Sequence, residues 1–138
     1  MKTRAIIHLA AIAHNLNTVR RLAPGSQIMA VVKADAYGHG ATSLLSTLET
    51  HTDALAVARI GEAQALRNAG YCGRLLLLCG VSNETELSEA LSLQLDIVAH
   101  DNTHLAVLAN HLNPAPLKTT VWLKMDTGMH RLGFAPQD

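Results

Sequence analysis

Lys33 is the residue with the clearest chemical potential in this sequence. It directly follows the apolar run at residues 28–32 and precedes Gly38 and Gly40. A lysine at the carboxyl end of a buried strand is partly desolvated, which favours the neutral amine that nucleophilic or Schiff-base chemistry needs. The two glycines would let backbone amides approach an anion where a helix begins, and the Tyr37 hydroxyl would bind the same anion. These residues suit an aldehyde cofactor that carries a phosphate; a solvated lysine before a glycine-containing turn is the alternative.

A second polar cluster follows the apolar run at residues 119–123. It contains Lys124, Asp126, His130 and Arg131. An arginine can bind a carboxylate through two parallel hydrogen bonds, so Arg131 is a candidate for holding an acidic group. The sequence Asp-Thr-Gly that begins at Asp126 is typical of a turn that ends a strand. A charged loop with internal ion pairs is the alternative interpretation.

Both clusters stand where predicted strands end. The apolar runs are nearly continuous, which indicates strands that are covered on both faces, as in parallel sheets. Predicted strands lie at residues 28–32, 54–57, 75–78, 95–98 and 119–123. Predicted helices lie at residues 9–22 and 60–69 and begin near residues 40, 83 and 101; residues 3–9 are predicted as a further short strand. Asn83 followed by Glu86 is a signature of a capped helix start.

Strands that alternate with helices predict a parallel α/β fold. Two architectures are compatible with this pattern. A doubly wound five-stranded sheet would be a complete domain at 138 residues, whereas a (β/α)8 barrel needs about 250 residues and would be only partly present. In either architecture the carboxyl ends of the strands share one edge, so Lys33 and Arg131 are expected at the same edge.

The composition excludes several classes of protein. Apolar residues make up 49% of the chain, which excludes intrinsic disorder. Lys and Arg total 11, as do Asp and Glu, and this balance argues against a nucleic-acid or anionic-membrane partner. No apolar stretch reaches the ~18 residues of a membrane helix, and no signal peptide is recognisable. Cys72 and Cys79 form no disulfide framework, so a soluble cytoplasmic protein is expected.

His100 and His104 have a spacing that can bind a metal ion on one face of a helix. Asp101 is the only carboxylate beside them, and it is expected to cap the helix instead. No metal site is therefore predicted.

The two polar clusters resemble the signature motifs of one enzyme family. Residues 31–40, Val-Val-Lys-Ala-Asp-Ala-Tyr-Gly-His-Gly, look like the pyridoxal-phosphate attachment motif of bacterial alanine racemases. Residues 124–133, Lys-Met-Asp-Thr-Gly-Met-His-Arg-Leu-Gly, resemble the second signature of that family. Residues 56–59 with Glu62 and Ala63 are similar to a third, weaker motif. The resemblance covers essentially the whole chain but corresponds only to the N-terminal part of the family's length.

The resemblance implies a role for each candidate site residue. Lys33 would carry the cofactor, pyridoxal 5'-phosphate, and act as the base on one face of the substrate. Tyr37 would bind the cofactor phosphate, and Arg131 would hydrogen-bond the cofactor's phenolic oxygen and help to place the substrate carboxylate. Met129 would approach the substrate through its backbone. Lys124 would be the lysine that is carbamylated in many members and that orients Arg131.

The resemblance also implies a fold and an activity. Members of this family, which are fold-type III enzymes, combine an N-terminal (β/α)8 barrel with a C-terminal β-domain, form homodimers, and interconvert L-alanine and D-alanine for peptidoglycan. Residues 1–138 would be the N-terminal portion of the barrel, with about five of its eight strands, and the remaining strands and the β-domain would be absent. The opposite-face base of the family, a tyrosine from the partner's C-terminal domain, has no match here, so this chain is expected to be inactive alone. Two alternatives remain: a non-catalytic module for pyridoxal-phosphate binding and homeostasis, and another fold-type III amino-acid racemase.

Overall fold

Five parallel strands form one sheet in the computed structural model, which describes residues 4–111 and 119–137. The strands are β1 (Met29–Val31), β2 (Ala54–Val57), β3 (Leu75–Leu77), β4 (Leu95–Ala99) and β5 (Val121–Leu123). Their order in the sheet is the same as their order in the sequence, and each neighbouring pair is parallel. A doubly wound sheet reverses its strand order at a switch point, whereas a barrel does not. The fold is therefore a run of parallel β/α units of a TIM-type barrel, and the doubly wound alternative is wrong.

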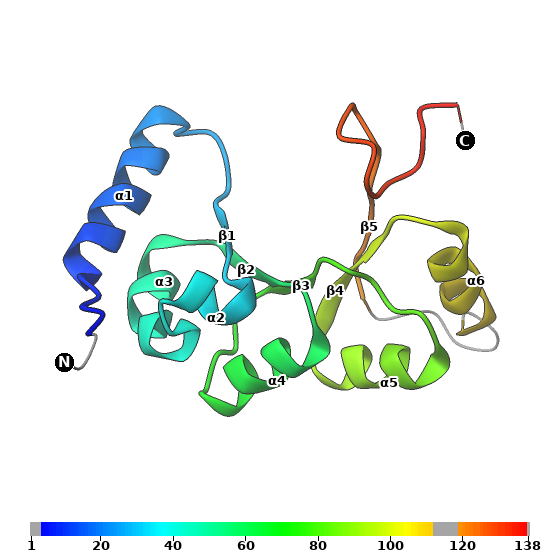
Figure 1. Cartoon of the computed structure of the whole chain (residues 1–138), viewed down its shortest axis with the longest axis horizontal. Helices are drawn as coiled ribbons and strands as arrows, with labels where there is room; N and C mark the ends of the chain where they lie inside the picture. Colours follow the sequence, from blue (N-terminus) through cyan, green and yellow to red (C-terminus); the bar gives the residue numbers. More distant parts are fainter. Residues whose placement is uncertain (1–3, 112–118, 138) are drawn as a thin grey trace.

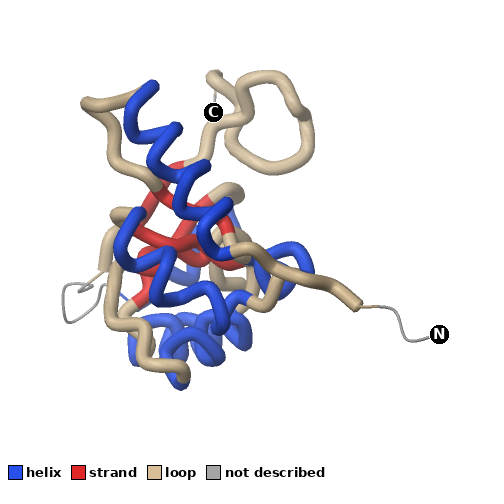
Figure 2. Tube along the Cα trace, turned by 90° about the vertical axis from the view of Figure 1, so that its left-hand side faces the viewer, coloured by secondary structure: helices blue, strands red, loops and turns tan. Residues whose placement is uncertain are grey.

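Helices follow the strands and cover one face of the sheet (Figure 1). They are α1 (Leu9–Leu22), α2 (Lys33–Gly38), the 3-10 helix η1 (Ala41–Leu44), α3 (Leu45–His51), α4 (Ile60–Asn68), α5 (Glu84–Ser92) and α6 (Asn102–His111). The tube view of Figure 2 shows most of these helices on one side of the strands, with α1 rising past the edge of the sheet. This arrangement leaves the carboxyl ends of the strands open to bind a ligand.

The two faces of the sheet are packed differently. Leu55, Leu75 and Ile97 point toward the helices and belong to one large cluster of buried side chains. The alternate residues Ala56 and Leu76 point to the other face and belong to a much smaller cluster. Because side chains alternate along a strand, the small cluster lies on the face that lines the interior of a barrel.

The sequence-based boundaries agree with most of the structure. The predicted helix at residues 9–22 is confirmed at both ends, and the helix expected from residue 40 is divided into η1 and α3. The side chain of Asn83 accepts a hydrogen bond from the Glu86 amide at 2.9 Å, which confirms the predicted cap of α5.

The short strand predicted at residues 3–9 is wrong for its described part. Residues 4–8 carry no regular secondary structure, and Leu9 already begins α1. The His8 carbonyl accepts hydrogen bonds from the Ala11 and Ile12 amides, so the apolar residues of this segment lead into a helix. Residue 3 lies outside the described residues.

None of the described helices has the combination of length and apolar character that crossing a bilayer requires. The longest of those with described bounds, α1, has 14 residues against the about 20 of a spanning helix.

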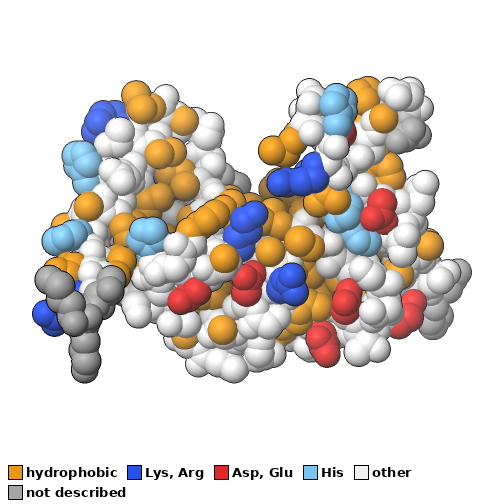
Figure 3. Space-filling model, in the orientation of Figure 1, with side chains coloured by type: hydrophobic (Ala, Val, Ile, Leu, Met, Phe, Trp, Pro, Cys, Tyr) orange, Lys and Arg blue, Asp and Glu red, His pale blue; other side chains and the backbone are white. Residues whose placement is uncertain are grey.

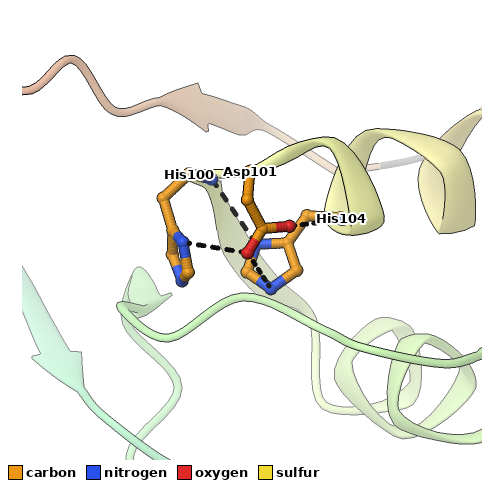
Figure 4. A group of neighbouring side chains, drawn as sticks. All are labelled: His100, Asp101 and His104. Carbon is orange, nitrogen blue, oxygen red and sulfur yellow. Dashed lines mark hydrogen bonds and ion pairs between the residues drawn. The ribbon is translucent and has the colours of Figure 1, made fainter. Parts of the chain in front are cut away.

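His100, Asp101 and His104 meet at the start of α6 (Figure 4). Asp101 Oδ1 accepts a hydrogen bond from the His104 amide at 3.1 Å, which is the predicted cap, and Asp101 Oδ2 lies 3.4 Å from His100 Nδ1. Nδ1 of His104 accepts the His100 amide at 3.4 Å, so its other ring nitrogen carries the proton. A histidine that binds a metal ion through one ring nitrogen donates a hydrogen bond from the other. Nδ1 of His104 is an acceptor here, so the hydrogen bonds of this cluster stabilise the start of α6.

Burial makes His104 sensitive to pH. Desolvation lowers the pKa of His104, the nearby His100 lowers it further, and Asp101 and Glu86 oppose the shift. Below the ordinary histidine pKa of 6.5 the unfolded chain binds a proton that the folded chain binds less readily. We therefore expect the free energy of unfolding to fall as the pH drops from 6.5 toward the lower pKa of the folded protein.

Urea unfolding at several values between about pH 5 and about pH 8 checks this expectation. His104→Gln should flatten the decrease, whatever its effect on absolute stability. His14→Gln, at an exposed position of α1, should leave the pH dependence unchanged. Parallel curves for the original protein and His104→Gln would contradict the assignment.

Candidate active site

Three cationic side chains line one pocket at the carboxyl edge of the sheet. Lys33 follows β1, and Lys124 and Arg131 follow β5, the strand at the opposite end of the sheet. The pocket has a volume of about 220 Å³, and its other lining residues are Ala58, Leu78, Cys79 and Leu132. Figure 3 shows Lys and Arg side chains around the hollow between the two raised ends of the molecule. The sheet thus brings together residues that are far apart in the sequence, as their positions after strands predict.

These three cations have no carboxylate partner among residues 4–111 and 119–137. The ion pairs of that part of the chain involve other side chains, such as Arg20 with Asp53 and Arg74 with Asp96. The Lys33 amine instead lies 5.9 Å from the centre of the Tyr37 ring. Positive charges that converge without compensation attract an anion. The pocket therefore fits a ligand that carries phosphate or carboxylate groups.

Lys33 begins a turn with an unusual backbone. The four residues that follow it, Ala34 to Tyr37, all have φ between +51° and +55°. This left-handed conformation costs roughly 1–2 kcal/mol for each residue that is not glycine. Such strain persists only where the surroundings fix the turn, and it is concentrated at functional sites. Gly38 and Gly40 also have positive φ, at +83°, so their place in the sequence was a partial signal of this turn.

The segment that carries Arg131 is closed by hydrogen bonds of Asp126. Asp126 Oδ1 accepts from the Gly128 and His130 amides at 3.0 Å, and Oδ2 lies 3.0 Å from His130 Nδ1. The backbone hydrogen bonds from Gly128 and His130 hold the pKa of Asp126 below its usual range. Asp126 is therefore used within the loop, as the charged-loop alternative predicts, whereas Arg131 remains available to the pocket.

Backbone contacts complete this closure. The Phe134 amide donates to the Lys124 carbonyl at 2.9 Å, and the Asp126 amide donates to the Phe134 carbonyl at 2.7 Å. The chain thus returns to the end of β5 directly after Arg131, which fixes the segment at both ends.

The other two predicted site residues do not line this pocket. Tyr37 is 61% exposed on the left-handed turn, with its ring facing the Lys33 amine. Met129 is 75% exposed, and its predicted backbone contact with the substrate stays a prediction. Glu62 is a residue at this site to which the sequence analysis assigned no role. Its carboxylate accepts a hydrogen bond from the amide of Ala34, the residue after Lys33. Its signal was its place at the third position of α4, where a capping glutamate is expected.

Comparisons with known proteins agree with this geometry. Residues 7–138 match the family described as alanine racemase, N-terminal domain. The chain is 51% identical over 134 residues to an alanine racemase of Nitrosococcus oceani, a match that covers 97% of this chain and 37% of that protein. Its structure is similar to the crystal structure of a biosynthetic alanine racemase from Pseudomonas aeruginosa, with a TM-score of 0.84, 41% identity and coverage of 94% and 36%. A histidine racemase from Leuconostoc mesenteroides is similar as well, with a TM-score of 0.80, 27% identity and coverage of 92% and 34%.

The chain spans little more than a third of the length of these relatives. The matched residues 7–138 include both polar clusters and the five strands that position them. The chain therefore belongs to the alanine racemase N-terminal domain family.

Proposed function

We propose that this chain is the cofactor-binding N-terminal portion of a pyridoxal-phosphate-dependent alanine racemase. The observation that supports this most directly is the convergence of Lys33, Lys124 and Arg131 on one pocket. Pyridoxal phosphate offers an aldehyde to an amine, and a phosphate and a phenolic oxygen to cations and hydroxyl groups. When bound, the cofactor accepts electrons from the α-carbon of an amino acid and makes the α-proton acidic.

In this proposal Lys33 has two tasks. Its Nζ would hold the cofactor, and the same amine would take up or return the α-proton on one face of the substrate. The Tyr37 hydroxyl would bind the phosphate, Arg131 would bind the phenolic oxygen and the substrate carboxylate, and the backbone of Met129 would border the substrate. The half-buried position of Lys33 limits its contact with water and so favours proton exchange with the substrate.

Lys124 as an ordinary ammonium group would repel Arg131, because both line the same small pocket. We propose that it is carbamylated. Its amine would add to carbon dioxide and lose a proton, which replaces a positive charge with a carbamate. That carbamate would accept hydrogen bonds from the guanidinium and orient it.

Racemisation needs a second base on the opposite face, and neither tyrosine of this chain suits that role. Tyr37 does not line the pocket and is assigned in this proposal to the cofactor phosphate. Tyr71 is buried, its hydroxyl donates to the Arg74 carbonyl at 2.9 Å, and burial raises its pKa. We therefore propose a homodimer in which the partner subunit supplies the second base from a part of the protein that this chain does not contain.

Chiral analysis of the products tests the proposed activity. The complete protein that contains this chain, loaded with pyridoxal phosphate, should convert L-alanine into D-alanine, whereas the 138-residue chain should convert it no faster than free cofactor. L-Histidine supplied in parallel tests the broader racemase alternative, because one similar structure is a histidine racemase. Cofactor binding without any D-amino acid product would favour the homeostasis module.

We further propose that the D-alanine serves peptidoglycan synthesis in the cytoplasm. The presence of two free cysteines, Cys72 and Cys79, both exposed, is consistent with a reducing compartment.

A further inference from the structure

A single carboxylate ties together two of the turns at the open edge of the sheet. Glu62 Oε1 accepts a hydrogen bond from the Ala34 amide at 2.7 Å. Its other oxygen, Oε2, accepts from the amides of Ala58 and Arg59 at 2.8 and 3.0 Å. Ala34 lies in the turn after β1, and Ala58 and Arg59 lie in the turn after β2. Glu62 therefore fixes the distance between two neighbouring turns that both border the candidate active site.

The start of α4 accounts for the contacts of Oε2 but not for the contact of Oε1. Glu62 is the third residue of the helix, and Oε2 reaches back to the Arg59 amide as a capping glutamate does. The bond from Oε1 crosses to a residue 28 positions earlier in the sequence and contributes nothing to the cap. This second bond needs a reason outside the helix.

That reason lies in the strained turn that begins at Lys33. Four consecutive left-handed residues are stable only if contacts with the rest of the protein hold them. Asp35 supplies one such contact, because its Oδ1 accepts the Ala41 amide at 2.7 Å and so fixes the end of the turn. Glu62 supplies the contact at the beginning, on the amide directly after Lys33. The direction in which the Lys33 side chain leaves the backbone therefore depends on Glu62.

We propose that Glu62 is a positioning residue for Lys33, which holds the left-handed turn so that the lysine amine faces the cationic pocket. This inference rests on the proposed function, since it assigns to Lys33 the attachment of pyridoxal phosphate. Glu62 itself does not line that pocket and acts through the backbone.

Three variants separate positioning from capping. Glu62→Ala removes both contacts, and Glu62→Asp is one methylene shorter, so it still offers a carboxylate to the helix start but no longer reaches Ala34. Glu62→Gln keeps one oxygen that can accept from the Ala34 amide. It should therefore retain more Ala34 protection and more Lys33 modification than Glu62→Ala does. Glu86 provides the matched control, because it occupies the same third position in α5 and accepts the Ser82 amide at 2.7 Å.

Two measurements on the purified protein give the result. Amide hydrogen exchange in the cofactor-free protein reports whether the Ala34 amide is protected. Addition of pyridoxal phosphate below saturation, followed by borohydride and peptide mass mapping, reports how much of Lys33 has reacted. We expect Glu62→Ala and Glu62→Asp to lose about tenfold in Ala34 protection and in the fraction of Lys33 modified. Glu86→Ala should lower the melting temperature comparably to Glu62→Ala and change neither quantity.

The outcomes distinguish the two proposals. If Lys33 of the original protein forms no adduct, the proposed function and this inference both fail. If the original protein forms the adduct and Glu62→Asp forms it equally well, only the positioning role of Glu62 is overturned. The same conclusion follows if Glu86→Ala reduces the adduct as much as Glu62→Ala.

Discussion

Replacement of Lys33 with alanine should abolish covalent attachment of pyridoxal phosphate to this chain. The sequence contains four lysines, and two of them, Lys33 and Lys124, line the pocket in which cations converge. Lys33 begins the strained turn at the carboxyl end of β1, whereas Lys124 follows β5 on the loop that carries Arg131. Both lysines are half-buried and lack a carboxylate partner among the described residues. The proposed carbamylation of Lys124 would remove its nucleophilic amine, so attachment of the cofactor aldehyde is assigned to Lys33.

The experiment compares Lys33→Ala with Lys124→Ala. Each protein is mixed with pyridoxal phosphate, reduced with borohydride, digested and mapped by mass spectrometry. The original protein and Lys124→Ala should carry the reduced adduct on the peptide that contains residue 33, and Lys33→Ala should carry none. A full-length Lys33→Ala enzyme should racemise alanine no faster than free cofactor. An adduct that appears on Lys124 in the original protein would overturn the assignment of Lys33.

The edge of the sheet at which the site forms could be predicted from the sequence. Lys33 and Arg131 each follow an apolar run, and parallel strands bring their carboxyl ends to one edge whatever the architecture. The choice between barrel and doubly wound sheet could not be made in this way, because it depends on which strands are neighbours. The hydrogen-bonded pairing of the strands decides that, and local periodicity does not record which strands pair.

The left-handed backbone conformation after Lys33 could not be predicted from the sequence pattern either. Ala34 and Ala36 are residues that favour right-handed helices, yet they adopt positive φ. The contacts that enforce this conformation come from Glu62 on α4 and from Asp35, so tertiary structure overrides local preference. The family resemblance assigned roles to the side chains at this site, but not the conformation that presents them.

The loop that holds Arg131 depends on the lack of a side chain at residue 133. A Cβ atom at Gly133 would lie 2.7 Å from the Asp126 nitrogen and 2.9 Å from the Met125 carbonyl carbon, both of them backbone atoms. These atoms belong to the place where Met125 pairs with Phe134 and closes the loop. Gly133→Ala should therefore open this closure and release Arg131 from the pocket.

Gly128→Ala is the matched control, because it changes the same residue type in the same loop. Gly133 and Gly128 have φ of +120° and +141°, so alanine at either position adds backbone strain of roughly 1–3 kcal/mol. No atom lies within 4 Å of a Cβ at Gly128, so that variant adds strain without a collision. The difference between the two variants therefore isolates the contact at residue 133 from the strain.

Titration with pyridoxal phosphate, followed by its change in absorbance, measures the consequence. Gly133→Ala should weaken cofactor binding by about tenfold or more, which corresponds to the loss of one charge-assisted hydrogen bond from Arg131. Gly128→Ala should bind the cofactor severalfold more tightly than Gly133→Ala does. Equal affinities would mean that backbone strain, and not the closure between Met125 and Phe134, governs the loop.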